Sequence, residues 1–156
     1  MFANILVPLD GSALSEQALA MAQHLARASD TSLHLLHVIS MRPEMDALHS
    51  SGDESMTILE MARDAARRLR EAQTARGKTY LEGLAGQLQQ AGLHVTTALR
   101  EGAADEHIVA YAKEHEIDLI IMSTHGHSGF KRFFLGSVTD RVIRAGQTPV
   151  LVLPAS

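Results

Sequence analysis

Residues 118–140 read DLIIMSTHGHSGFKRFFLGSVTD. The opening run, Asp118–Met122, is apolar after its first residue and shows no polar alternation, which is typical of a parallel strand buried on both faces. A loop with several glycines follows, and a helical pattern begins at Ser137. A buried strand that leads through such a loop into a helix is a building block of parallel α/β folds.

The alternation of strands and helices continues in both directions from this segment. Apolar runs typical of buried strands cover five ranges: Asn4–Leu9, Ser32–Ile39, Leu93–Leu99, Asp118–Met122 and Pro149–Leu153. Helical patterns lie between them, at Ser12–Ala28, Ser55–Ala91, Ala103–His115 and Ser137–Ala145. This order predicts an α/β fold with a five-stranded parallel sheet, right-handed crossovers and helices on both faces. With 156 residues and no repeat, residues 1–156 are expected to form one domain.

The helices carry signals for their ends and for breaks within them. Ser15 is the expected cap of the first helix, with Ser12 as the alternative. The long helix contains Gly77, Gly83 and Gly86, and we expect these glycines to interrupt or bend it because glycine is a poor helix former.

Composition narrows the class of protein. There are no cysteines, which excludes disulfides, thiolate metal sites and thiol catalysis. A net charge of −4 argues against a general nucleic-acid binder, and the absence of Trp argues against a base-stacking platform. The chain begins without the pattern of a signal peptide, and no run approaches the roughly 18 apolar residues that span a bilayer. We therefore expect a cytoplasmic protein that does not insert into membranes.

The start of the last helix offers phosphate-binding chemistry. A helix start leaves backbone N–H groups unpaired and carries partial positive charge, and nearby glycines let a ligand approach the backbone closely. Gly136 and the hydroxyls of Ser137 and Thr139 fit such a cradle. A capping arrangement is the alternative, with Ser137 as the cap and Asp140 reaching back. Capping and phosphate binding compete for the same N–H groups, so both cannot be complete at once.

The spacing of this segment resembles a known signature. The segment has Gly126, then nine residues, and then Gly136-Ser137. This spacing is similar to the ATP-binding signature of universal stress proteins. The flanking blocks agree: Ile5–Ser12 near the start, Leu36–Ile39, and Thr148–Val152 near the end are typical of that family. The signature begins with a glycine three residues before Gly126, and this chain has Ser123 there. Serine adds a side chain where the family's glycine lies against the ribose.

The resemblance implies a doubly wound sheet of order 3-2-1-4-5 and a ligand at its switch point, between the first and fourth strands. It implies ATP, with Mg²⁺ bridging the phosphate oxygens. No catalytic residue and no protein metal site follow from it, and any ATP hydrolysis is expected to be slow. The site residues that it implies are Pro8, Leu9 and Val38 around the base, Asp10 beside the adenosine, Met122, Ser123, Thr124 and His125 on the ribose side, and Gly126, Gly129, Gly136, Ser137, Val138 and Thr139 along the phosphates.

The last strand predicts a partner. Its residues Val150, Leu151, Val152 and Leu153 are apolar on both faces, and the proposed order puts them at a sheet edge. Exposed apolar edges invite association, so a homodimer that pairs two such strands is expected, and the family resemblance implies the same arrangement. The alternative is that the chain covers its own edge.

Other functions remain open. His125 and His127 form a close pair, but a metal site needs further ligands. The basic cluster Arg67-Arg68-Leu69-Arg70 fits a solvated, salt-bridged helix face better than a nucleic-acid site. The main prediction is an ATP-binding regulatory or sensor module. The alternatives are a dimeric interaction module of the same fold without nucleotide, which Ser123 favours, and a slow ATPase.

Overall fold

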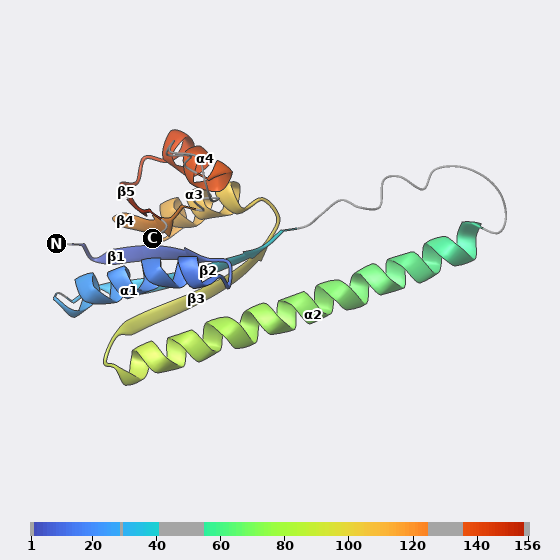
Figure 1. Cartoon of the computed structure of the whole chain (residues 1–156), viewed down its shortest axis with the longest axis horizontal. Coiled ribbons are helices and arrows are strands. Elements are labelled where there is room, and N and C mark those ends of the chain that lie inside the picture. The colour runs from blue at the N-terminus through green and yellow to red at the C-terminus, as the bar shows by residue number, and fades with distance from the viewer. Residues whose placement is uncertain (1, 29, 41–54, 125–135, 155–156) are drawn as a thin grey trace.

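The structure is a computed structural model that describes residues 2–28, 30–40, 55–124 and 136–154. Five parallel strands form one sheet of order β3-β2-β1-β4-β5, which confirms the predicted α/β fold (Figure 1). The predicted boundaries differ from the observed ones by at most two residues. The elements are β1 (Asn4–Leu9), α1 (Ala13–Arg27), β2 (Ser32–Ile39), α2 (Ser55–Gln90), β3 (His94–Glu101), α3 (Ala104–Glu114), β4 (Leu119–Ser123), α4 (Ser137–Ala145) and β5 (Val150–Leu153).

Helices cover both faces of the sheet and divide the core into two layers. On one face, α1 and α2 pack on β1, β2 and β4 through residues such as Leu19 and Leu81. On the other face, α3 and α4 contribute Ile108 and Val142 to the second cluster. The central strands are apolar on both sides because both sides are covered, which explains their lack of alternation. The strands β1 and β4 are neighbours in this sheet. Their carboxyl ends therefore lie side by side between the two helical layers.

The helix α2 runs without interruption through Gly77, Gly83 and Gly86, so the predicted breaks are wrong. Its second half packs on the sheet, and this packing outweighs the weak helix propensity of glycine, which costs only about 1 kcal/mol per residue. Gly77 has a packing role, because a Cβ there would lie 2.9 Å from Leu99 Cδ1. The first half of α2 extends past the carboxyl end of the sheet (Figure 1).

His34 on β2 is buried, with only 8% of its surface exposed. Its Nδ1 lies 3.1 Å from the Tyr111 hydroxyl, and the ring packs beside Tyr111 and His115. Burial, and secondly the neighbouring His115, lower the pKa of His34 below its usual value of 6.5. The imidazole is therefore held neutral inside the fold.

This neutral imidazole predicts a loss of stability in acid. Below about pH 6.5, His34 binds a proton in the unfolded chain but binds it less readily in the native state, where its pKa is lower. The free energy of unfolding therefore falls as the pH falls through this range. One such group contributes a slope of at most about 1.4 kcal/mol per pH unit. Urea unfolding between about pH 7.5 and 5.5 should show a flatter profile for His34→Gln than for the native protein. The control is His94→Gln, at an exposed histidine of β3. Equal slopes for all three proteins would contradict this prediction.

Candidate functional site

A cavity of about 290 Å³ opens at the carboxyl ends of β1 and β4, where the strand order reverses. Ligands of doubly wound sheets bind at this position because the loops leave the two strands in opposite directions there. Its walls come from β1, β2 and β4 and from the first turns of α1, α3 and α4. The lining residues are Pro8, Leu9, Asp10, Ser15, Leu36, Val38, Ala104, Ile108, Met122, Ser123, Gly136, Ser137, Val138 and Thr139.

The inner part of this cavity is apolar. Leu36 and Ile108 are fully or almost fully buried, and Met122 is 7% exposed. These side chains belong to the layer beneath α3 and α4, so the cavity is a recess in that layer that stays open at the edge of the sheet. A recess with such walls suits a flat, apolar ring system rather than a hydrated ion.

A rigid turn holds Asp10 at the mouth of the cavity. Its Oδ1 accepts hydrogen bonds from the Ser12 backbone N–H at 2.9 Å and from the Ser12 hydroxyl at 2.6 Å. Gly11 between them has a φ of +81°, which glycine adopts at little cost. Ser12 is also the N-cap of α1, since its hydroxyl accepts from the Ser15 N–H at 3.2 Å. The capping residue is therefore Ser12, and the prediction of Ser15 was wrong because its own hydroxyl donates back to the Ser12 carbonyl.

The start of α4 faces the same cavity without a side-chain cap. Gly136 is the N-cap, and no side chain of the described residues accepts a hydrogen bond from the amides of this turn. The alternative in which Ser137 caps the helix is therefore wrong. Asp140 does not reach back either, because its Oδ2 accepts from Arg144 Nε at 2.9 Å, one turn further on. The first N–H groups of α4 and the hydroxyls of Ser137 and Thr139 thus lie beside the cavity, with the positive end of the helix dipole.

The cavity brings together ten of the fourteen residues expected at the site. Thr124 is described but does not line the cavity; its N–H donates to the Leu153 carbonyl at 3.0 Å. His125, Gly126 and Gly129 lie outside the described residues, as does His127 of the histidine pair. The ten that line the cavity are Pro8, Leu9, Asp10, Val38, Met122, Ser123, Gly136, Ser137, Val138 and Thr139.

Four lining residues were not predicted: Ser15, Leu36, Ala104 and Ile108. Leu36 and Ile108 read as ordinary core residues, since nothing local separates a side chain at a cavity wall from one inside the core. Ala104 begins α3, and only the packing of that helix next to α4 brings it to the cavity. A signal existed for Ser15 alone, as a polar residue at the start of the helix that follows the first strand.

The described part of the chain contains neither a candidate metal site nor a candidate membrane span. No group of three or more His, Cys, Asp or Glu side chains there could hold a metal ion. None of the helices in these ranges is both long and apolar enough to cross a bilayer. Arg67 lies 3.5 Å from Asp64 and both are exposed, which agrees with a salt-bridged, solvated face.

Comparison with known proteins gives concordant matches. The model of the universal stress protein family matches residues 1–154. Universal stress protein MJ0577 of Methanocaldococcus jannaschii is 30% identical over 98% of this chain and 95% of its own length. Universal stress protein YxiE of Bacillus subtilis is also 30% identical, over 98% of this chain and 99% of its own length.

Solved structures agree with these matches. The structure of MJ0577 has a TM-score of 0.78 at 28% identity and covers 100% of this chain and 98% of its own. A universal stress protein family protein from Arabidopsis thaliana, solved with AMP bound, has a TM-score of 0.68 at 17% identity, over 99% of this chain and 92% of its own. At this identity the second structure shows the shared fold alone.

Proposed function

The chain belongs to the universal stress protein family, and from this premise we propose that it is a regulatory module that binds ATP in the cavity between β1 and β4. The observation that carries the proposal is the combination of an apolar recess, a fixed carboxylate and an uncapped helix start around one opening. These three features match the three parts of a nucleotide: base, ribose and phosphates. The AMP-bound Arabidopsis thaliana protein supports this at the level of the fold, since the same architecture holds an adenosine there.

The base is assigned to the recess. Pro8, Leu9, Leu36 and Ile108 line it. The backbone of Val38, which also lines the cavity, is expected to contact the edge of the adenine. The volume of about 290 Å³ is at the lower end of the range of roughly 300–1,000 Å³ that small-molecule sites occupy, which leaves room for an adenosine but not for the whole triphosphate. The phosphates then extend out of the recess toward α4.

The ribose is assigned to the mouth of the recess, near Asp10. A carboxylate only accepts hydrogen bonds, and the ribose hydroxyls are donors, so an acidic residue at this point of a nucleotide fold selects the sugar. Ser123 at the end of β4 also lines the cavity. Its hydroxyl is available for the ribose, although its side chain occupies space that a glycine would leave open.

The phosphates are assigned to the start of α4. The N–H groups of Ser137, Val138 and Thr139 and two hydroxyls replace the hydrogen bonds that the phosphate oxygens make with water. Asp10 is the only carboxylate among the described lining residues, so Mg²⁺ is expected to be held chiefly by phosphate oxygens and water. Phosphoryl transfer relies on cationic side chains and a positioned nucleophile. Whether the protein hydrolyses ATP is therefore a question for residues 125–135, which lie outside the described residues.

Three measurements test the proposal: nucleotide release, calorimetric titration and the melting temperature. Heat denaturation of purified protein should release adenine nucleotide that chromatography identifies, and calorimetric titration of stripped protein with Mg-ATP should give saturable heat. A ligand of the native state must also stabilise it, by about 2.7 kcal/mol at one hundred times its dissociation constant. No released nucleotide, no heat and an unchanged melting temperature at millimolar Mg-ATP would favour the alternative, an interaction module without nucleotide.

We also propose a homodimer through β5. All four residues of β5 are half-buried within one chain, and β5 is the edge strand next to β4. Pairing with a second β5 around a two-fold axis would satisfy the edge backbone and bury the apolar side chains. Light scattering should give twice the mass of one chain, and Val152→Lys should shift the mass to that of one chain while the far-ultraviolet spectrum stays native. A Val152→Lys protein that remains dimeric would place the interface elsewhere.

A further inference from the structure

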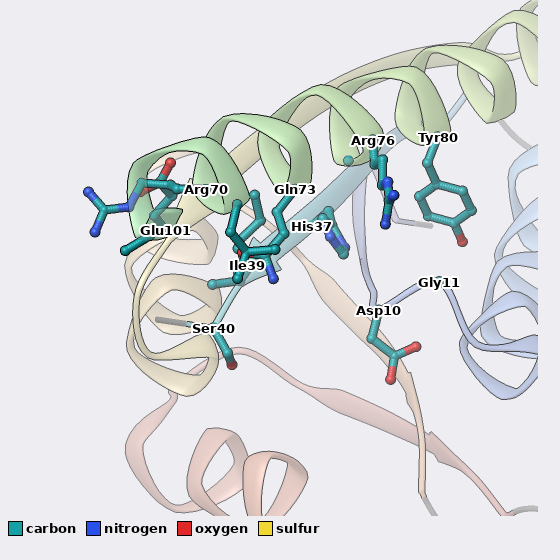
Figure 2. Close-up of a pocket in the computed structure, with 14 residues that line it drawn as sticks. Asp10, Gly11, His37, Ile39, Ser40, Arg70, Gln73, Arg76, Tyr80 and Glu101 are labelled. Carbon is teal, nitrogen blue, oxygen red and sulfur yellow. The ribbon is translucent and has the colours of Figure 1, made fainter. Parts of the chain in front are cut away.

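A second and larger cavity, of about 970 Å³, lies on the other face of the sheet. We call it the α2 groove. One wall is the face of α2 from Ala66 to Tyr80, and the other is the carboxyl edge of β1, β2 and β3 (Figure 2). Among the described residues that line the two cavities, only Asp10 and Val38 are shared, so the groove is distinct from the proposed nucleotide site.

The groove exists because α2 is longer than the sheet that it covers. Its inner face is buried at Gly77, Leu81, Ala85 and Leu88, where it packs on the strands. The helix continues past the end of the sheet, where Leu69 lines the groove and is still 61% exposed. A large apolar side chain that its own core leaves exposed beside a cavity presents contact surface to another molecule.

Among the described residues, the charges that line the groove leave one cation, Arg76, without an ion-pair partner. Glu101 lies 3.9 Å from Arg70 and accepts a hydrogen bond from Thr74 at 3.3 Å. The Asp10 carboxylate points away from α2 (Figure 2). Arg76 points from α2 toward the turn at Asp10 and Gly11, and it forms no ion pair or hydrogen bond with any of the described residues.

Two polar neighbours are already engaged. His37 donates from Nδ1 to the Leu9 carbonyl at 2.7 Å, and Tyr80 donates to Glu16 at 3.3 Å. Burial, followed by the charge of Glu16, raises the pKa of Tyr80 to about 12, so the phenol stays protonated in that hydrogen bond. Arg76 is thus the principal site of charge recognition, with the Gln73 amide one turn away.

We propose that the α2 groove is a second ligand site, which takes an amphipathic anion: an apolar body that carries a single carboxylate, phosphate or sulfonate group. Arg76 pairs with the anionic group through its planar fork of donors. Leu69, Ala66 and Ile39 contact the apolar body. The volume suits a small molecule of this kind. This site does not depend on the nucleotide proposal.

The probe for this site is 8-anilinonaphthalene-1-sulfonate, which joins an apolar ring system to one sulfonate. In a titration of the full folded chain, amide resonances of Gly77 and Gly11 in the groove should move, while that of Gly136 in the other cavity should not. Arg76→Ala should weaken binding about tenfold, the loss expected for a charge-assisted hydrogen bond. Its neutral analogue, N-phenyl-1-naphthylamine, should bind the native and Arg76→Ala proteins equally.

A matched control comes from the same helix. Arg63 is an exposed arginine of α2 that does not line the groove, so Arg63→Ala should leave the affinity unchanged. Leu69→Ser should weaken both probes, because it removes apolar contact. Equal losses for Arg63→Ala and Arg76→Ala would reduce the effect to net charge and overturn the proposal. Shifts confined to Gly136, or no shift at any of these glycines, would overturn it as well.

Discussion

Gly136→Asp is expected to abolish nucleotide binding while leaving the protein as stable as before or slightly more so. Gly136 is the N-cap of α4, and its φ of −54° and ψ of 151° are accessible to any residue. Aspartate is a preferred N-cap, so its carboxylate should accept hydrogen bonds from N–H groups of the first turn and complement the helix dipole, for a gain of about 0.5 kcal/mol. The same carboxylate would take the place of the phosphates and repel them, which should weaken binding on the order of a hundredfold or more.

Three substitutions at this position separate the causes of that loss. Gly136→Asn caps the amides without adding a charge, and Gly136→Ala adds neither a cap nor a charge. The affinity should therefore be highest for Gly136→Ala, lower for Gly136→Asn and lowest for Gly136→Asp. Calorimetric titration with Mg-ATP measures the affinity, and urea unfolding measures the stability. If Gly136→Asp binds Mg-ATP as tightly as the native protein, the phosphates do not lie at the start of α4.

Leu81→Ala should destabilise the protein by about 2–5 kcal/mol, which is the usual cost of truncating a buried leucine. Leu81 is 2% exposed and packs in the layer beneath α1 and α2. The same substitution at Leu69, on the same helix but past the end of the sheet, should change the free energy of unfolding by less than about 0.5 kcal/mol.

This pair of substitutions has equal intrinsic effects on helix propensity, so the difference between the two variants reports tertiary packing alone. Urea unfolding of both proteins at one pH gives the comparison. A large loss for Leu69→Ala would mean that the first half of α2 packs on something in solution, such as a second copy of the chain, and would contradict its exposure in the structure.

Much of the fold was predictable because its signals are local. The runs Asn4–Leu9 and Asp118–Met122 are apolar on both faces, and only a parallel sheet covered on both sides buries such strands. Most of the cavity was also predictable, since the ends of these two strands and the turn at Gly136 are adjacent in any sheet of this order. The ligand contacts assigned to all fourteen residues stay predictions, and His125, Gly126 and Gly129 also lie outside the described residues.

The sequence by itself determined the order of strands and helices, the family and the segment that begins α4, since each rests on neighbours in the chain. The tertiary structure decided what depends on distant neighbours. It selected Ser12 over Ser15 as a cap, it paired Asp140 with Arg144 rather than with its own helix start, and it buried His34 beside Tyr111. It also decided where α2 leaves the sheet. Local patterns specify which face of an element is apolar, but only packing decides whether another part of the chain reaches that face.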